Sequence, residues 1–256
     1  MEATSSWSAL SRLGRRTVSL TWVAAILAAS LGTPVLAQVV IPSVPGTANP
    51  YLAGMPGGST CCGGDAVPAQ SPTQVTGLAL VPGSTLTFSV TGSVNFGPGP
   101  SGNPPDGGGT ASTPANNGIS GASWPANALV GVFLDNSLPT ATPAPADLNF
   151  GTAGATRFAS LSPALKQAFF IGDGLTGNGT GAVQTFVVPA GATRLFLGTS
   201  DGFGWFNNSG SFAVTIAGAA PPPTAGTAAI PTLSLPMLVA MSLALAGVGM
   251  LLFRRR

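Results

Sequence analysis

The stretch "TLTFSVTGSV" (residues 85–94) alternates apolar residues with small polar ones. A β-strand that buries one face has this pattern, because successive side chains point to opposite faces. Other short runs are rich in β-branched and aromatic residues and are bounded by Gly, Pro or Asn, as strands are. These runs are "QVTGLALV" (74–81), "ALVGVFLD" (128–135), "VQTFVV" (183–188), "TRLFLGT" (193–199) and "SFAVTIA" (211–217). Short strands separated by turns predict an all-β fold, here a single jelly-roll-like β-sandwich.

The segments between these strands are expected to be loops, with one exception. "SPALKQAF" (162–169) is predicted to form a short helix with Pro163 at its first position. The Gly- and Pro-rich stretch 97–109 predicts a long irregular loop. Residues 38–49 are loop-like as well, so we assign 38–71 to a Pro/Gly-rich N-terminal segment and 72–217 to the sandwich.

Charged residues make up only 6% of the 256 residues and are unevenly placed, with six arginines near the two chain ends. Between these ends lie three basic residues and six aspartates, which leave a formal charge of −3. They are Arg157, Lys166, Arg194, Asp65, Asp106, Asp135, Asp147, Asp173 and Asp201. No basic patch remains to neutralise phosphates, which argues against nucleic acid as a partner.

The N-terminus has the features of an export signal, with arginines, an uncharged run at 17–31 and then "TPVLA" (33–37). We expect residues 1–37 to be a signal peptide that is cleaved after Ala37. The alternative is a membrane anchor that stays in place, although the apolar run is short for a membrane span. The segment "GRRTVSL" (14–20) also matches a twin-arginine signal weakly, and both routes lead out of the cytoplasm.

The C-terminus is predicted to contain a transmembrane helix. Residues 230–253 carry no charge, and as a helix they would span roughly 36 Å, against about 30 Å for the hydrocarbon core of a bilayer. The arginines at 254–256 should stay cytoplasmic, which places the preceding domain outside. The Pro/Ala-rich segment 218–229 is expected to be an extended linker.

"IPTLS" (230–234), the apolar stretch and "RRR" resemble the IPTL-CTERM and PEP-CTERM sorting signals of Gram-negative bacteria. The resemblance covers residues 230–256. It implies that an exosortase-type peptidase in the inner membrane processes the tail and releases the protein to the cell envelope or the extracellular matrix. "LPM" after "IPTLS" departs from the acidic and aromatic residues of the common pattern. An ordinary single-span anchor is the alternative.

The sequence contains few of the residue combinations that common catalytic mechanisms require, and we do not expect an enzyme. The chain has no histidine, which removes Ser-His-Asp and Cys-His catalysis. Six aspartates lie in the body, but no spacing singles out a pair for glycoside hydrolysis. Lys166 follows Ser162 by four positions, as in a Ser-Lys dyad, yet a surface lysine explains the pattern equally well.

The adjacent Cys61 and Cys62 leave three interpretations open for an exported protein. They form a vicinal disulfide, bond to another molecule, or remain free thiols in a flexible loop, the interpretation that we favour. A metal site is not expected, because two thiolates alone supply too few ligands. "GDGLTGNGTG" (172–181) lacks the repeated acidic ligands of a calcium loop and is interpreted as a glycine-rich hairpin.

The stretch "SDGFGWFNNSGSF" (200–212) gathers one carboxylate and two amides in a short glycine-rich loop. Calcium takes carboxylate, amide and backbone oxygens in flexible sets of six to eight. Asp201, Asn207 and Asn208 offer three side-chain oxygens, and Gly202 and Gly204 let the backbone turn its carbonyls inward. The alternative is a plain hairpin in which these side chains bind only neighbouring backbone donors.

"NNSGSFAVTIAG" (207–218) is similar to the last strand and preceding loop of the PA-IL-like galactophilic lectins, bacterial β-sandwich proteins that bind galactose through calcium. "TLTFSVTGSVNFGP" (85–98), "VQTFVVP" and "TRLFLGTSD" extend the resemblance over most of residues 72–217. It implies a calcium ion held by side chains and backbone carbonyls of Phe96, Asp201, Gly204, Asn207 and Asn208. Asp201 and Asn207 would also hydrogen-bond the sugar.

The chain departs from that lectin pattern in three places. The loop is one residue shorter, so the carbonyl is supplied by Gly204 or Trp205, or this ligand is lost. In "PANNG" (114–118), Asn117 stands where a sugar-contacting residue is expected, while the histidine of the family has no replacement. Residues 139–167 have no counterpart. We further expect Trp205 or a neighbouring phenylalanine to flank the sugar, the alternative being that these rings fill the end of the sandwich.

Together these features predict an exported, calcium-dependent, lectin-like protein that binds galactose-like or other surface glycans. The alternative is a structural envelope or matrix protein with the same sandwich and no sugar site. Because a single sugar binds weakly, at about millimolar affinity, adhesion would need several domains acting together, for example in a homo-oligomer.

Overall fold

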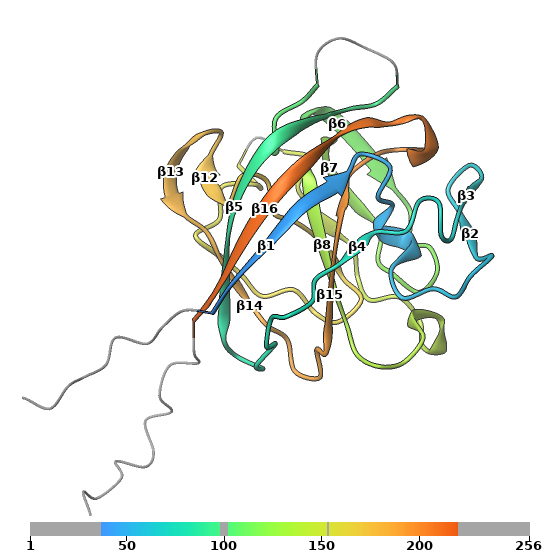
Figure 1. Ribbon diagram of the computed structural model, residues 1–256, viewed down its shortest axis with the longest axis horizontal. Helices are drawn as coiled ribbons and strands as arrows, with labels where there is room; N and C mark the ends of the chain where they lie inside the picture. The colour runs from blue at the N-terminus through green and yellow to red at the C-terminus, as the bar shows by residue number, and fades with distance from the viewer. Residues whose placement is uncertain (1–36, 98–101, 153, 220–256) are drawn as a thin grey trace, which may run out of the picture. The chain divides into compact units, whose positions relative to one another are not determined.

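The longest strands, β5 (Thr85–Asn95) and β16 (Ser209–Ala219), lie side by side across one sheet (Figure 1). They pair antiparallel without interruption, from Ser209 opposite Asn95 to Ala219 opposite Thr85. The computed structural model describes residues 37–97, 102–152 and 154–219. The predicted alternation in 85–94 holds at its start, because Leu86, Phe88 and Val90 are buried between less buried neighbours.

This sheet has five strands in the order β1-β16-β5-β14-β10. The other members are β1 (Ala37–Pro45), β14 (Thr185–Val187) and β10 (Ser160–Leu161). The prediction that residues 38–49 form a loop is therefore wrong for 38–45, since β1 pairs antiparallel with β16. Two prolines made this stretch look irregular, but β1 is an edge strand with a shift of register between Ile41 and Val44, where prolines are tolerated.

A second sheet has four strands in the order β11-β8-β15-β4. Its members are β11 (Ala168–Phe170), β8 (Leu129–Leu134), β15 (Arg194–Thr199) and β4 (Thr73–Gln74). Every residue of β8 is buried, as expected for a strand with neighbours on both sides and on both faces. The predicted helix at 162–169 is absent. Lys166 instead has a φ of 64° in a turn, and its N–H donates to the Phe133 carbonyl.

Smaller sheets and single turns of 3₁₀-helix complete the described residues. They comprise β6 (Gly108–Thr113), β7 (Ala122–Ala126) and β9 (Leu148–Asn149) in one sheet, the hairpins β2 (Thr60–Cys61)–β3 (Asp65–Ala66) and β12 (Leu175–Gly177)–β13 (Thr180–Val183), and the 3₁₀ turns η2 (Pro50–Leu52), η3 (Pro139–Ala141) and η4 (Trp205–Asn207). The β12–β13 pair confirms the hairpin interpretation of "GDGLTGNGTG".

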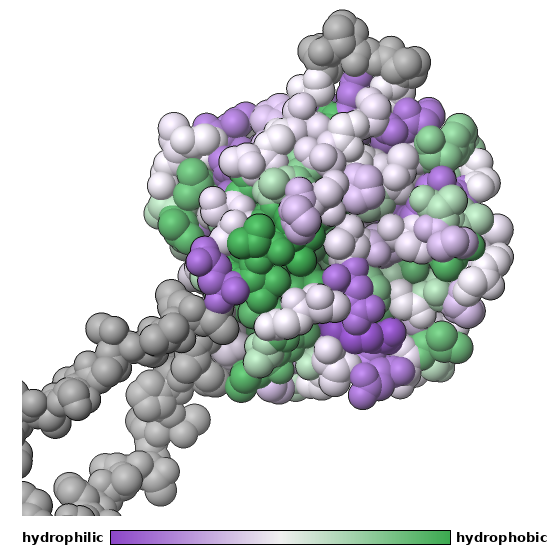
Figure 2. All heavy atoms as spheres, in the orientation of Figure 1, coloured by the Kyte–Doolittle hydropathy of each residue, from purple (hydrophilic) through white to green (hydrophobic). Residues whose placement is uncertain are grey.

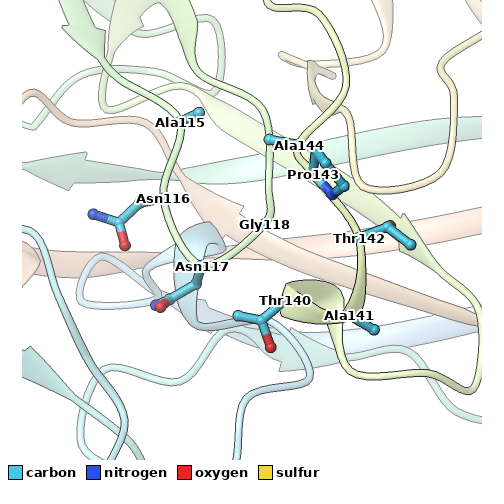
Figure 3. Close-up of a pocket in the computed structure, with 9 residues that line it drawn as sticks. All are labelled: Ala115, Asn116, Asn117, Gly118, Thr140, Ala141, Thr142, Pro143 and Ala144. Carbon is cyan, nitrogen blue, oxygen red and sulfur yellow. The ribbon is translucent and has the colours of Figure 1, made fainter.

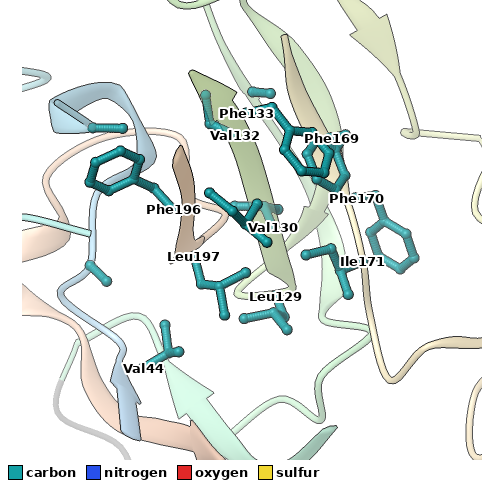
Figure 4. Close-up of a cluster of buried hydrophobic side chains, with 14 of the residues drawn as sticks. Val44, Leu129, Val130, Val132, Phe133, Phe169, Phe170, Ile171, Phe196 and Leu197 are labelled. Atoms are coloured by element: carbon teal, nitrogen blue, oxygen red, sulfur yellow. The ribbon is translucent and has the colours of Figure 1, made fainter. Parts of the chain in front are cut away.

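The two larger sheets share one hydrophobic cluster (Figure 4). Phe169 of β11 and Phe186 of β14 bring their ring centroids to 5.7 Å, and Phe133 of β8 stacks on Phe169 at 5.2 Å. The cluster also contains Tyr51 and Leu52 of η2. The predicted all-β class is confirmed, and residues 38–71 belong to the folded domain instead of forming a separate segment.

The surface is largely polar on the face seen in Figure 2, with an apolar area over the region of β1 and β16. Val40 of β1, which is 64% exposed, points away from the core. In the described parts of the chain, no helix is long and apolar enough to span a bilayer. Residues 1–36 of the predicted signal peptide, most of the linker and the C-terminal sorting signal lie outside the described residues, while Ala37 begins β1.

Candidate functional site

The loop 200–208 connects β15 to β16 and is anchored in the core by Trp205. This side chain is completely buried, and its Nε1 donates to the Thr199 carbonyl at 2.7 Å. Its ring lies against Tyr51, with a centroid distance of 5.9 Å. The prediction that Trp205 flanks a sugar is corrected, because a ring without exposed surface has none to stack on a ligand. Trp205 fills the end of the core, as the alternative expectation stated.

Asp201 stands at the start of this loop with one of its carboxylate oxygens unused. Oδ1 accepts the N–H of Gly202 at 2.6 Å and that of Phe203 at 3.4 Å. The Asp201 carbonyl accepts Thr113 Oγ1 at 2.6 Å, which fixes the backbone. Oδ2 is buried and has no hydrogen-bond partner within the described residues. A buried carboxylate oxygen without a donor favours a bound cation or water.

Asn208 closes the loop and also has a buried, unused oxygen. The residue is 6% exposed, and its Nδ2 donates to the Gly46 carbonyl at 3.1 Å. This bond orients the amide, leaving Oδ1 buried and without a partner among the residues described. Asn207, by contrast, is exposed. Two predicted calcium ligands thus account for two of the five buried side-chain atoms that lack partners in this part of the chain.

The backbone ligands predicted for the site lie at the same end of the fold. Gly204 has a φ of 74°, in the left-handed region that favours glycine, and immediately precedes η4. The Trp205 carbonyl already accepts the Asn208 N–H at 3.0 Å, which makes Gly204 the better of the two expected carbonyl donors. Phe96 follows Asn95, the partner of Ser209 across the β5–β16 ladder. The register of the sheet therefore brings Phe96 to the end of the loop.

Asn117, the other predicted sugar contact, is engaged elsewhere. Its Nδ2 donates to the carbonyls of Tyr51 and Thr60 at 3.0 and 3.3 Å. It lines a pocket of about 580 Å³ together with Thr140 and neighbouring residues of the segment without a lectin counterpart (Figure 3). Within the described residues, no hydrogen bond joins Asn117 to the loop 200–208. The structure therefore does not bring it together with Asp201 through direct contacts.

Lys166 holds that segment in place instead of serving a Ser-Lys dyad. Its Nζ donates to the carbonyls of Pro139, Thr142 and Pro143 at 3.3, 2.9 and 2.7 Å. It also donates to Thr142 Oγ1 at 2.6 Å. A cation surrounded by such acceptors is a structural anchor for an irregular segment. The suggestion of a catalytic lysine thus has no support in the geometry.

Asp65 is the residue at this site that the sequence analysis missed. It is completely buried, and its carboxylate accepts three N–H groups at 2.9 Å each. The donors are Asn49 Nδ2, the Trp205 N–H and the Phe206 N–H. The one available signal was the "CCGGD" sequence, in which glycines let a short hairpin present an aspartate.

The neighbouring cysteines form a vicinal disulfide between Cys61 and Cys62, and the expectation of free thiols is corrected. Both cysteines lie in the β2–β3 hairpin or its turn, and Cys61 is buried. The Cys62 carbonyl accepts the Gly204 N–H at 3.0 Å. The turn that carries the disulfide therefore contacts the loop 200–208 directly.

Asp106 and Asp173 lie next to each other at the β12–β13 hairpin, outside the loop 200–208. Asp106 Oδ1 accepts the Asp173 N–H at 3.1 Å, while the Asp173 carboxylate accepts the N–H groups of Leu175 and Gly179. Burial raises the pKa of Asp106 to about 6, and the nearby charge of Asp173 acts in the same direction. Sequence reasoning could not pair these residues, because they are 67 positions apart.

In the described residues, no three Asp, Glu, Cys or His side chains gather as a metal-binding group. A cation in the loop 200–208 would therefore depend on amide and backbone oxygens beside the single carboxylate of Asp201. No protein-family model, curated protein or solved structure matches the chain.

Proposed function

We propose that this chain is an exported, calcium-dependent carbohydrate-binding protein whose scaffold is a single jelly-roll-like β-sandwich. The observation that carries the proposal is the pair of buried, unpartnered oxygens, Asp201 Oδ2 and Asn208 Oδ1. Leaving buried polar groups unsatisfied costs about 1–3 kcal/mol each. Two unpaired acceptors in one short loop are therefore the feature that supports a cation there.

The ion would be held by Asp201 and Asn208, with Asn207 and the carbonyls of Gly204 and Phe96 completing the protein ligands. These are the oxygen types that calcium prefers. Calcium supplies a positive charge that draws sugar hydroxyls into its coordination shell. Asp201 would accept hydrogen bonds from those hydroxyls, and Asn207 would accept or donate them. Asn207 is exposed, as that role requires.

In this proposal Phe203 and Phe206, instead of the buried Trp205, supply the aromatic rings that stack on the sugar. Both belong to the loop, and they are 70% and 55% exposed. An exposed phenyl ring can pack on the apolar C–H face of a pyranose, while a loop with no function would favour small polar residues. The ligands proposed are galactose-like or other surface glycans, bound weakly at each site and tightly by several domains together.

Delivery would use both ends of the chain. We propose that the signal peptide 1–37 directs export and that residues 230–256 anchor the protein in the inner membrane until an exosortase-type peptidase releases it. The ends of the domain suit this arrangement, because Gln38, the first residue after the proposed cleavage site, pairs with Ala217 of β16. The first strand of the mature domain thus begins beside the last residues of β16, at the opposite end of that strand from the loop 200–208.

Calorimetry with calcium, followed by a glycan array run with calcium and with chelator, tests this function. We expect heat from calcium in the ~10⁻⁴–10⁻³ M range, since only Asp201 brings charge to the ion. Glycan binding should be lost with the chelator. No calcium heat up to several millimolar would overturn the proposal.

The second candidate is a structural envelope protein without a sugar site. It is favoured by one observation, the bonds from the Gly202 and Phe203 N–H groups to Asp201 Oδ1, which are those of a local turn. Calcium-dependent retention on a galactose resin distinguishes the two candidates, because the structural protein would flow through with and without calcium.

A further inference from the structure

The β2–β3 hairpin and the loop 200–208 are far apart in sequence but contact each other at several points. The Gly204 N–H donates to the Cys62 carbonyl at 3.0 Å. Phe203 lies over Gly63, where an added Cβ would come within 2.5 Å of the Phe203 ring. The hairpin therefore touches the loop through its turn, in addition to the bonds made by Asp65.

Asp65 makes the strongest of these connections. Its Oδ2 accepts the N–H of Trp205 and its Oδ1 accepts that of Phe206, both at 2.9 Å. These two N–H groups begin η4, where a 3₁₀ turn leaves its first donors without internal partners. Hydrogen bonds to an ionised carboxylate are about twice as strong as neutral ones. Asp65 thus fixes the turn that contains Asn207 and leads directly into Asn208.

Asp65 is not itself a ligand for an ion in this loop. Both of its oxygens face N–H donors, and Asn49 Nδ2 adds a third bond at 2.9 Å to Oδ2. The Asn49 side-chain oxygen in turn accepts the Tyr51 N–H, so the carboxylate is joined to η2 in the core. The Asp65 carboxylate thus binds only N–H groups of the protein. Asp201 Oδ2, by contrast, has no donor in the described residues.

We propose that Asp65 is a positioning residue for the ligand loop and that the β2–β3 hairpin sets its calcium affinity; this inference rests on the proposed function. A loop that must order itself around an ion loses conformational entropy on binding, and this loss weakens the affinity. The hairpin removes that cost by holding η4 in place before the ion arrives. Asn208, which follows η4, then presents its oxygen already oriented.

The test compares Asp65→Asn with Asp135→Asn as a matched control. Asp135 follows β8 near Arg194, at the end of β15 opposite the loop, and its Oδ1 accepts only the Ser137 N–H among the described side-chain contacts. An asparagine at position 65 has one oxygen for three donors and turns an NH₂ group toward a backbone N–H. We expect calcium affinity to fall at least tenfold for Asp65→Asn and to stay unchanged for Asp135→Asn.

A merely structural role would lower the melting temperature in chelator and leave the calcium affinity of the folded variant unchanged. Hydrogen exchange at the Trp205 and Phe206 amides adds a local measurement, and both should exchange faster in Asp65→Asn. Should that variant fail to fold, Gly63→Ala decides the matter. Gly63 is exposed and has a φ of 88°, so an alanine there strains the hairpin turn and its Cβ displaces Phe203, which should weaken calcium binding several-fold.

The outcomes separate the inference from the proposed function. A wild-type protein that binds no calcium overturns the proposed function and this inference with it. A wild-type protein that binds calcium, with a folded Asp65→Asn or Gly63→Ala variant within twofold of its affinity, overturns this inference alone. A loss of affinity confined to the hairpin variants supports it.

Discussion

Asp201 is the only charged side chain that we assign to the calcium ion, so its replacement should be decisive. Asp201→Asn keeps the size of the side chain and the oxygen that accepts the Gly202 N–H. We expect it to abolish both calcium-induced thermal stabilisation and sugar binding while the domain still folds. Calorimetry on both proteins measures this, and equal heats from the two would show that the carboxylate binds no ion.

Asp106 should make stability depend on pH through its pKa, which burial raises from 3.8 to about 6. The folded state then holds this proton more tightly than the unfolded chain. The contribution is therefore fully present below pH 3.8 and is lost as pH rises through 6. Asp106→Asn should raise the free energy of unfolding at pH 7 by about 1 kcal/mol, since partial exposure screens the penalty.

Urea denaturation of the wild type and Asp106→Asn at pH 4 and pH 7 checks this expectation. The difference between the proteins should be small at pH 4 and larger at pH 7. A difference that is the same at both pH values would mean that ionisation of Asp106 has no part in it. Asp147→Asn, at an exposed position, serves as the control.

For individual residues, sequence reasoning succeeded where the residues of the site are neighbours in the sequence. The spacing of Asp201, Asn207 and Asn208 placed three oxygen donors in one short loop, and the structure leaves the oxygens of Asp201 and Asn208 buried and unpaired. It failed for Trp205 and Asp65. The Trp205 ring packs on Tyr51 of η2, and Asp65 accepts the N–H of Trp205 from 140 positions away; no local pattern reports such contacts.

Strand β1 was also missed by sequence reasoning, because its pairing with the distant strand β16 leaves no local pattern. Two prolines in residues 37–45 suggested a loop, whereas the sheet accepts them at its edge. The strands with clear alternation or long β-branched runs, such as β5, β8 and β15, were predicted close to their observed positions. The short strands β9 and β10 have two residues each and carry too little pattern to be predicted.

Opposite faces of β1 should respond differently to the same substitution. Val44 is fully buried and Val40 is 64% exposed. Val44→Ala should cost about 2 kcal/mol through lost burial and a residual cavity, which lowers the melting temperature by roughly 4–8 °C. Val40→Ala should change it little. Thermal melts of the two variants measure the difference, and equal melts would contradict the placement of β1 in the domain.

The whole molecule is predicted to be trimmed at both ends. The order of "IPTLS", apolar stretch and "RRR" predicts that the mature protein lacks residues 1–37 and those beyond about residue 230. Intact-mass measurement of the protein secreted by the native host tests both cleavages. Recovery only from the inner membrane, with Arg256 at the C-terminus, would refute the sorting proposal.

Strand β16 begins where the loop 200–208 ends and finishes at the last residue described, Ala219. Its length of eleven residues corresponds to roughly 35 Å at about 3.3 Å per residue. Gln38, the first residue after the proposed cleavage site, pairs with Ala217 near the far end of this strand. An affinity tag or a bead joined directly to Gln38 or to Ala219 would therefore stand nearly a full strand length from the loop 200–208. On a sensor surface coupled in this way, the loop 200–208 of each molecule would face the solution.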